Sequence, residues 1–132
     1  MKEETTVCKA LAAMVTDKGS ATPSEVRFVA HAALELGLDA ESNGEVQKVL
    51  GDGDNFTELV GAVETKPMRR FLFRQVVTAA LVDDTIDEEE KKYIATTAKA
   101  YGYKEALVSE FVAWIRDGMK WEQRGAELLD KM

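Results

Sequence analysis

The residues that crosslink small proteins or bind transition metals are almost absent from this chain. Its 132 residues include one cysteine and one histidine, Cys8 and His31. A single cysteine excludes an internal disulfide, and the scarcity of both residue types argues against a zinc or copper site. We expect Cys8 to be a small buried hydrophobe on an apolar helix face. The composition therefore predicts a fold held by its core, in a reducing cytoplasmic setting.

Long apolar runs, strand patterns and catalytic motifs are also missing. No stretch is apolar for long enough to predict a membrane span, and residues 1–19 lack the basic start and apolar run of a signal peptide. No alternating pattern predicts a strand. The chain has no Gly-rich phosphate loop, nucleophile elbow or metalloprotease helix. The sequence therefore predicts a protein that is not an enzyme and does not span a membrane.

A basic excess is missing as well, because the net charge is −7 at neutral pH. Residues 1–66 carry 6 Lys or Arg against 12 Asp or Glu, and residues 67–132 carry 11 against 12. Six of the acids in the second half lie in the eight residues Asp83 to Glu90. Phosphate backbones would repel such a chain, so nucleic acid is not an expected partner. Cations and basic protein surfaces fit this charge better.

Helical periodicity is what the chain does contain, along nearly its whole length. Apolar residues recur at helical spacing in segments bounded by Gly, Pro and N-cap residues. The pattern predicts helices over about 3–16, 23–36, 44–50, 55–63 and 67–82, with more to follow. The segment Phe71–Val82 is nearly all apolar, so we expect the other helices to cover it on most sides. The predicted fold class is all-α.

Two helix starts carry the capping-box arrangement, in which the N-cap side chain and an acid three residues later satisfy each other's backbone N–H groups. The first pairs Thr22 with Glu25 and has Pro23 at the first helical position. The second pairs Asp87 with Glu90. Both acids therefore have a structural role that needs no ligand.

The two halves of the sequence resemble each other at an offset of 65 residues. Glu25 falls on Glu90, Gly37 on Gly102, and Phe56 on Trp121. We interpret this as a duplicated four-helix unit, with repeats at 1–66 and 67–132 packed as one compact bundle in a single domain. Two units are too few for an open solenoid. Trp114 and Trp121 are then expected to be core or boundary residues.

The doubled pattern of an apolar helix, an acidic turn, a second helix and a closing X-Gly-X resembles the TerB-like family, which includes the tellurite-resistance protein B and the N-terminal domain of the DjlA co-chaperone. The matching residues are 79–90 with Tyr101-Gly102-Tyr103, and more faintly 12–19 with Leu36-Gly37-Leu38. The resemblance implies an all-helical, non-catalytic domain that serves stress-response assemblies, some of them membrane-linked.

Carboxylates in the acidic turns are the ligands that hard cations such as Ca²⁺ and Mg²⁺ prefer. If the family's acidic positions bind a cation, the matching residues here are Asp17, Glu25, Asp83 and Glu90. Neither turn is an EF-hand, since Phe28 and Ile94 stand where the twelfth-position Glu belongs. Capping explains most of these acids, but the helix dipole disfavours Asp17 and Asp83 at helix C-termini. We expect a cation site only if these two acids converge in space.

A basic stretch at the start of the predicted central helix is the other candidate site. It comprises Lys66, Arg69, Arg70 and Arg74. Such a stretch is usually a solvated face, but it could receive acids of the turn, including Asp84 and Asp87, from a second copy in a symmetric homodimer. The leading hypothesis is a cytoplasmic interaction module that works through its acidic turns with protein partners. The alternative is a divalent-cation-binding protein.

Overall fold

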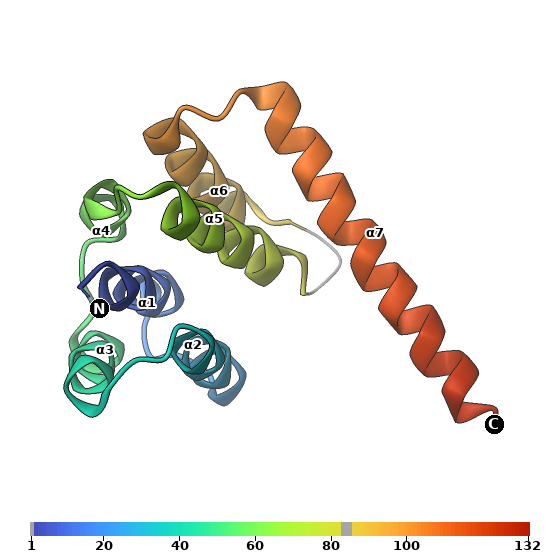
Figure 1. The fold of residues 1–132 in the computed structure, drawn as a ribbon, viewed down its shortest axis with the longest axis horizontal. Coiled ribbons are helices and arrows are strands. Elements are labelled where there is room, and N and C mark those ends of the chain that lie inside the picture. The colour runs from blue at the N-terminus through green and yellow to red at the C-terminus, as the bar shows by residue number, and fades with distance from the viewer. Residues whose placement is uncertain (1, 83–85) are drawn as a thin grey trace. The chain divides into compact units, whose positions relative to one another are not determined.

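A computed structural model describes residues 2–82 and 86–132 (Figure 1). Within these residues the chain forms seven helices and no strand, so the all-α prediction is confirmed. None of these helices is long and apolar enough to cross a membrane. The helices are α1 (Lys2–Val15), α2 (Pro23–Glu35), α3 (Ala40–Asp52), α4 (Phe56–Ala62), α5 (Lys66–Leu81), α6 (Glu88–Tyr101) and α7 (Glu105–Asp130).

Both capping boxes predicted from the sequence are formed. At the start of α2, the Thr22 hydroxyl accepts the Glu25 N–H at 3.2 Å, and the Glu25 carboxylate accepts the Thr22 N–H at 2.8 Å. At the start of α6, Asp87 and Glu90 exchange the same pair of bonds at 2.8 and 3.0 Å. These bonds satisfy amides that would otherwise lack an intrahelical partner, and they fix where each helix begins.

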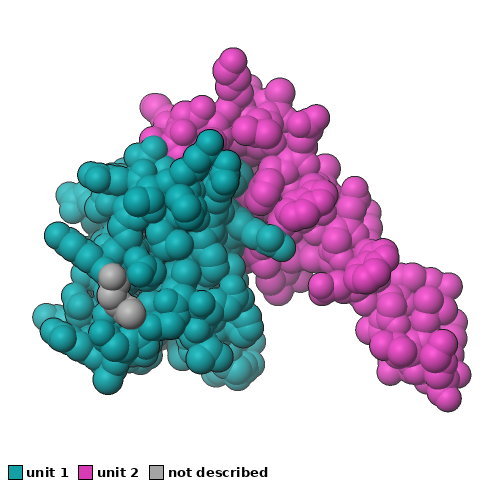
Figure 2. Space-filling view, in the orientation of Figure 1, with its two compact units in different colours: residues 1–75 teal, residues 76–132 magenta. Residues whose placement is uncertain are grey.

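The chain divides into two compact units, residues 1–75 and 76–132 (Figure 2). In the first unit α1 is the hub, because α2, α3 and α4 all pack against it. Val7 and Leu11 on α1 are completely buried, as is Val60 on α4, and Phe56 is only 9% exposed. Burial of these side chains is the main stabilising contribution available to a unit without disulfides.

Glu3, in the first turn of α1, caps the start of α5. Its carboxylate accepts hydrogen bonds from the Thr65 hydroxyl and from the backbone N–H groups of Glu64 at 2.7 Å and Thr65 at 3.1 Å. These bonds, helped by the charge of Arg69, hold the pKa of Glu3 below its ordinary value of 4.5. Arg69 also donates from Nε to the Val63 carbonyl at 2.9 Å. The α4–α5 junction is thus tied to the start of the chain.

The second unit repeats the helix starts of the first. α6 begins at Glu88 and α2 at Pro23, and α7 begins at Glu105 and α3 at Ala40, so both pairs are 65 residues apart. The glycines that follow α2 and α6 both adopt the left-handed backbone that glycine favours, with φ of 68° and 72°. These helix starts therefore recur at the 65-residue offset as far as the start of α7.

Beyond that point the two halves differ, because α7 continues where α3 ends. In the first unit Gly53 takes a φ of 76° and the Asn55 side chain caps α4 by accepting a backbone N–H at 3.0 Å. The corresponding residues, Gly118 and Lys120, lie inside α7, and a lysine side chain has no acceptor with which to cap a new helix. The described part of the second half therefore has three helices where the repeat predicts four.

Candidate functional site

The acids predicted as cation ligands have different surroundings. Glu25 and Glu90 close the capping boxes, so each carboxylate already accepts a backbone N–H. Asp17 is exposed just after α1. Asp83 and the predicted contact residue Asp84 lie outside the described residues, so a cation site that requires Asp83 close to Asp17 stays a prediction. Among residues 2–82 and 86–132, no three His, Cys, Asp or Glu side chains are grouped so that they could hold a metal ion.

The predicted basic stretch is only partly available to a partner. Lys66, Arg70 and Arg74 are exposed along α5. Arg69 is half-buried and is held by the Val63 carbonyl, which gives it a structural role. The acid predicted to meet this stretch, Asp87, is exposed, and its carboxylate accepts the Glu90 N–H. A homodimer contact between the stretch and the acidic turn stays a prediction.

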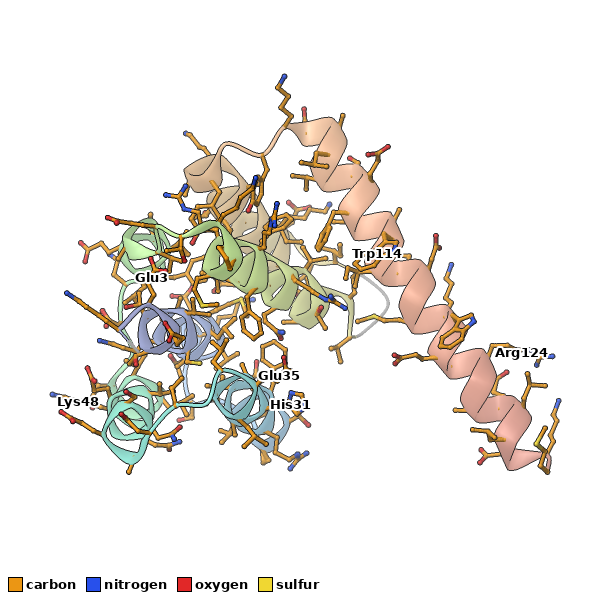
Figure 3. All side chains as sticks on the ribbon, in the orientation of Figure 1. Glu3, His31, Glu35, Lys48, Trp114 and Arg124 are labelled. Atoms are coloured by element: carbon orange, nitrogen blue, oxygen red, sulfur yellow. The ribbon has the colours of Figure 1, made fainter. Side chains whose placement is uncertain are left out.

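The cysteine and the histidine are both accounted for by their surroundings. Cys8 is completely buried on α1, and burial raises the pKa of its thiol from 9.0 to about 12. A thiol in that environment is not a nucleophile at neutral pH. His31 is exposed on α2, where Nδ1 lies 3.0 Å from a carboxylate oxygen of Glu35 one turn later (Figure 3). Neither residue forms a catalytic arrangement in the described chain.

The exposed apolar side chains are concentrated on α7. Trp114 is 57% exposed and Trp121 is 78% exposed, so the prediction that both are core or boundary residues is wrong. Six of the nine large hydrophobic side chains that are exposed in the described chain lie on this helix or just after it. They are Leu107, Trp114, Trp121, Leu128, Leu129 and Met132. A concentration of this kind is typical of a binding surface.

A second apolar seam on α7 is covered by the chain itself. It comprises Val108, Val112, Ile115 and Met119, which are buried or half-buried. After Met119 nearly every residue of the helix is exposed. The helix therefore uses one seam for its own fold over its first half, and most residues of a neighbouring seam are exposed.

The open seam follows a seven-residue repeat. Its members alternate at spacings of four and three, which keeps them on one side of a helix. We call this set the heptad face: Leu107, Phe111, Trp114, Gly118, Trp121, Gly125, Leu128 and Met132. All eight are apolar or glycine, over more than three heptads. This spacing is present in the sequence. The interpretation of 67–132 as a four-helix repeat misses it, because that interpretation divides the segment of α7 into two helices.

Comparison of the chain with protein-family models, with curated proteins and with solved structures finds no match. The fold, the caps and the α7 surface must therefore carry any functional conclusion.

Proposed function

We propose that this protein is a non-enzymatic interaction module whose working surface is the heptad face of α7. The observation that carries the proposal is the exposure of Trp121 and Leu128 on a helix whose other apolar seam is already covered. Exposing such side chains to water is unfavourable, and tryptophan is the residue most enriched at the energetic centres of protein interfaces. A seven-residue apolar repeat fits another helix, which can pack along its whole length.

Charge favours a protein partner over a membrane surface. Helices that lie on membranes carry an excess of Lys and Arg on their polar face. Between Glu105 and Asp130, α7 has six acidic and three basic residues, and the whole chain carries −7. Anionic lipid headgroups would repel this helix, as phosphate backbones would. A partner helix with mixed charge would not.

The TerB-like resemblance agrees with a non-catalytic role. As a TerB-like protein, the module would act in the cytoplasm as an accessory factor of a stress-response assembly. Some assemblies of this kind are membrane-linked. Its acidic turn would then be a second contact. Two acids of that turn, Glu88 and Glu89, lie 3.3 and 3.9 Å from the ammonium groups of Lys91 and Lys92. This pairing weakens the attraction of the turn for basic partners, so the apolar surface is the stronger candidate.

The alternative, a divalent-cation site built from the turn acids, has its own test. A ligand that binds only the folded protein raises the unfolding midpoint. A rise with millimolar Ca²⁺ or Mg²⁺ that disappears in the Asp17→Asn and Asp83→Asn variants would establish the site. An unchanged midpoint would mean that these acids bind no cation.

The working surface is tested by site-specific photo-crosslinking in cells that produce the protein. A benzophenone amino acid replaces Trp121 on the heptad face, and in a matched control it replaces Gln123, which is exposed on the polar side of the same helix. We expect an adduct from position 121 that is absent or much weaker from position 123. Equal labelling, or no adduct from position 121, would refute the proposed function.

A further inference from the structure

We propose that the heptad face of α7 binds the heptad face of a second copy of this chain, with the two helices antiparallel. This inference rests on the function proposed above and names its partner. The two copies are related by a twofold axis that crosses the heptad face midway between Gly118 and Trp121, so the contact is isologous and closes as a dimer. A residue that lies before this axis in one copy then faces the residue that lies equally far after it in the second copy.

Side-chain size selects this register. Along the heptad face the two tryptophans, Trp114 and Trp121, alternate with Gly118 and Gly125. In the antiparallel pairing Trp121 faces Gly118 of the second copy, and Trp114 faces Gly125. Each indole then enters the space that a glycine leaves, as a knob enters a hole. The outer layers pair apolar residues, Leu107 with Met132 and Phe111 with Leu128.

The two glycines have no explanation within one copy. Gly118 and Gly125 lie in the interior of a helix, where glycine is less favourable than alanine. A Cβ added at either position would meet no atom within 4 Å, so packing inside the chain does not require glycine there. Helix termination, the role suggested by the repeat for Gly118, is also excluded because α7 runs through it. A facing tryptophan from a second copy supplies the missing reason.

Charge independently selects the same register. Four charged residues flank the heptad face at intervals of seven. Each directly precedes one of its members (Phe111, Gly118, Gly125 or Met132), and they are Glu110, Asp117, Arg124 and Lys131. The first two are acidic and the last two are basic; Arg124 is labelled on α7 in Figure 3. In the antiparallel dimer Asp117 lies beside Arg124 of the second copy, and Glu110 lies beside Lys131. Flanking pairs of opposite charge set partner and orientation in paired helices.

A parallel pairing fails on both counts. It would stack Trp121 on Trp121 and Gly118 on Gly118, so crowded layers would alternate with empty ones. It would also bring Asp117 close to Glu122 of the second copy, two like charges at the edge of the contact. The sequence of α7 is therefore complementary to itself only when the second helix is reversed.

The test is the mass of the purified full chain in solution, measured by sedimentation over a range of concentrations. We expect a species of twice 14.6 kDa that dissociates on dilution. Asp117→Arg alone, or Arg124→Asp alone, turns two symmetric attractions into repulsions and should raise the dissociation constant by about tenfold or more. The double variant reverses both charges, restores opposite signs across the dimer and should recover the wild-type constant.

Two controls separate this effect from changes within one copy. Lys120→Glu reverses an exposed charge on the polar side of α7 and should leave the dimer unchanged. Arg124 also lies 3.6 Å from Glu127 in its own helix. The double variant loses that pair too, so recovery in the double variant must come from the contact between copies. Circular dichroism of each variant checks that α7 remains helical.

The outcomes are decisive in either direction. A chain that stays monomeric at hundreds of micromolar would overturn the second-copy inference, as would a dimer that Lys120→Glu disrupts equally. A dimer that the double variant does not restore would overturn the antiparallel register. An adduct from position 121 with the mass of a different protein would also overturn the inference, while leaving the proposed function supported. An adduct of two copies would support both.

Discussion

Replacing Phe56 and Trp121 by alanine, one at a time, should change the stability of a dilute monomer by very different amounts, although the two residues are equivalent in the predicted repeat. Phe56 begins α4 and is 9% exposed in the first unit, where α4 packs against α1. Trp121 lies within α7 and is 78% exposed. The comparison tests directly whether α7 continues past the point where α3 ends.

The expected magnitudes are well separated. Truncation of a buried phenylalanine typically costs about 3–5 kcal/mol, and a site at the start of a helix, near the surface, favours the lower end, about 3 kcal/mol. For a chain of 132 residues the unfolding entropy is about 0.28 kcal/mol/K, so this corresponds to a fall of about 11 °C in the unfolding midpoint. Truncation of an exposed side chain stays within about 0.5 kcal/mol, or about 2 °C.

The assay is thermal unfolding followed by circular dichroism, at a protein concentration low enough to keep the chain monomeric. If Trp121→Ala lowers the midpoint as much as Phe56→Ala does, residues after Met119 pack back onto their own unit and the description of α7 is wrong. If Phe56→Ala has no effect, α4 does not contribute to the core of the first unit. At high concentration Trp121→Ala should become destabilising, because the dimer buries the indole.

Three further results are expected. Glu3→Gln should lower the stability at neutral pH. Because the pKa of Glu3 is depressed in the folded chain, its contribution to stability is present above pH 4.5 and is lost as the pH falls through the folded pKa. The stabilities of the variant and the wild type, measured by urea unfolding, should therefore converge in acid, and a difference that stays constant with pH would refute the cap. Cys8, with its pKa raised to about 12, should react with a thiol reagent only as fast as the protein opens, and rapid labelling of the native chain would contradict its burial. Asp87→Ala should cost about 1 kcal/mol by removing the α6 cap, whereas Asp87→Asn should be nearly neutral, as measured by urea unfolding.

The parts of the fold that could be predicted are those encoded within a few residues. Thr22 with Glu25, and Asp87 with Glu90, satisfy each other across three positions, so the sequence alone is enough to locate two helix starts. The all-α class follows in the same way from apolar periodicity. The acidic turn is also a local feature, but a cation site built on it depends on where Asp17 and Asp83 lie in space, which local patterns do not determine.

The parts that could not be predicted depend on residues far apart in the chain. Glu3 resembles any acid in the first turn of a helix, a position that the helix dipole already favours. Its hydrogen bonds reach Glu64 and Thr65, across 61 and 62 residues, to the start of another helix. Nothing in the residues around position 3 distinguishes a cap for α5 from a solvated glutamate. The contact exists only because α1 and the α4–α5 junction meet in the first unit.

The exposed surface of α7 could not be predicted for a different reason, which is the conformational behaviour of glycine. Gly53 and Gly118 are equivalent in the predicted repeat, and yet one ends a helix while the other lies inside one. Glycine permits a left-handed turn but does not impose it, so the neighbouring residues decide. Asn55 caps α4, and the corresponding Lys120 cannot, so the helix continues and carries Trp121 into solvent. Because that one cap is lost, the segment that corresponds to the packed helix α4 becomes the exposed second half of α7. Tryptophan alternates with glycine along α7, and this alternation is what packing against a second copy of the same helix requires.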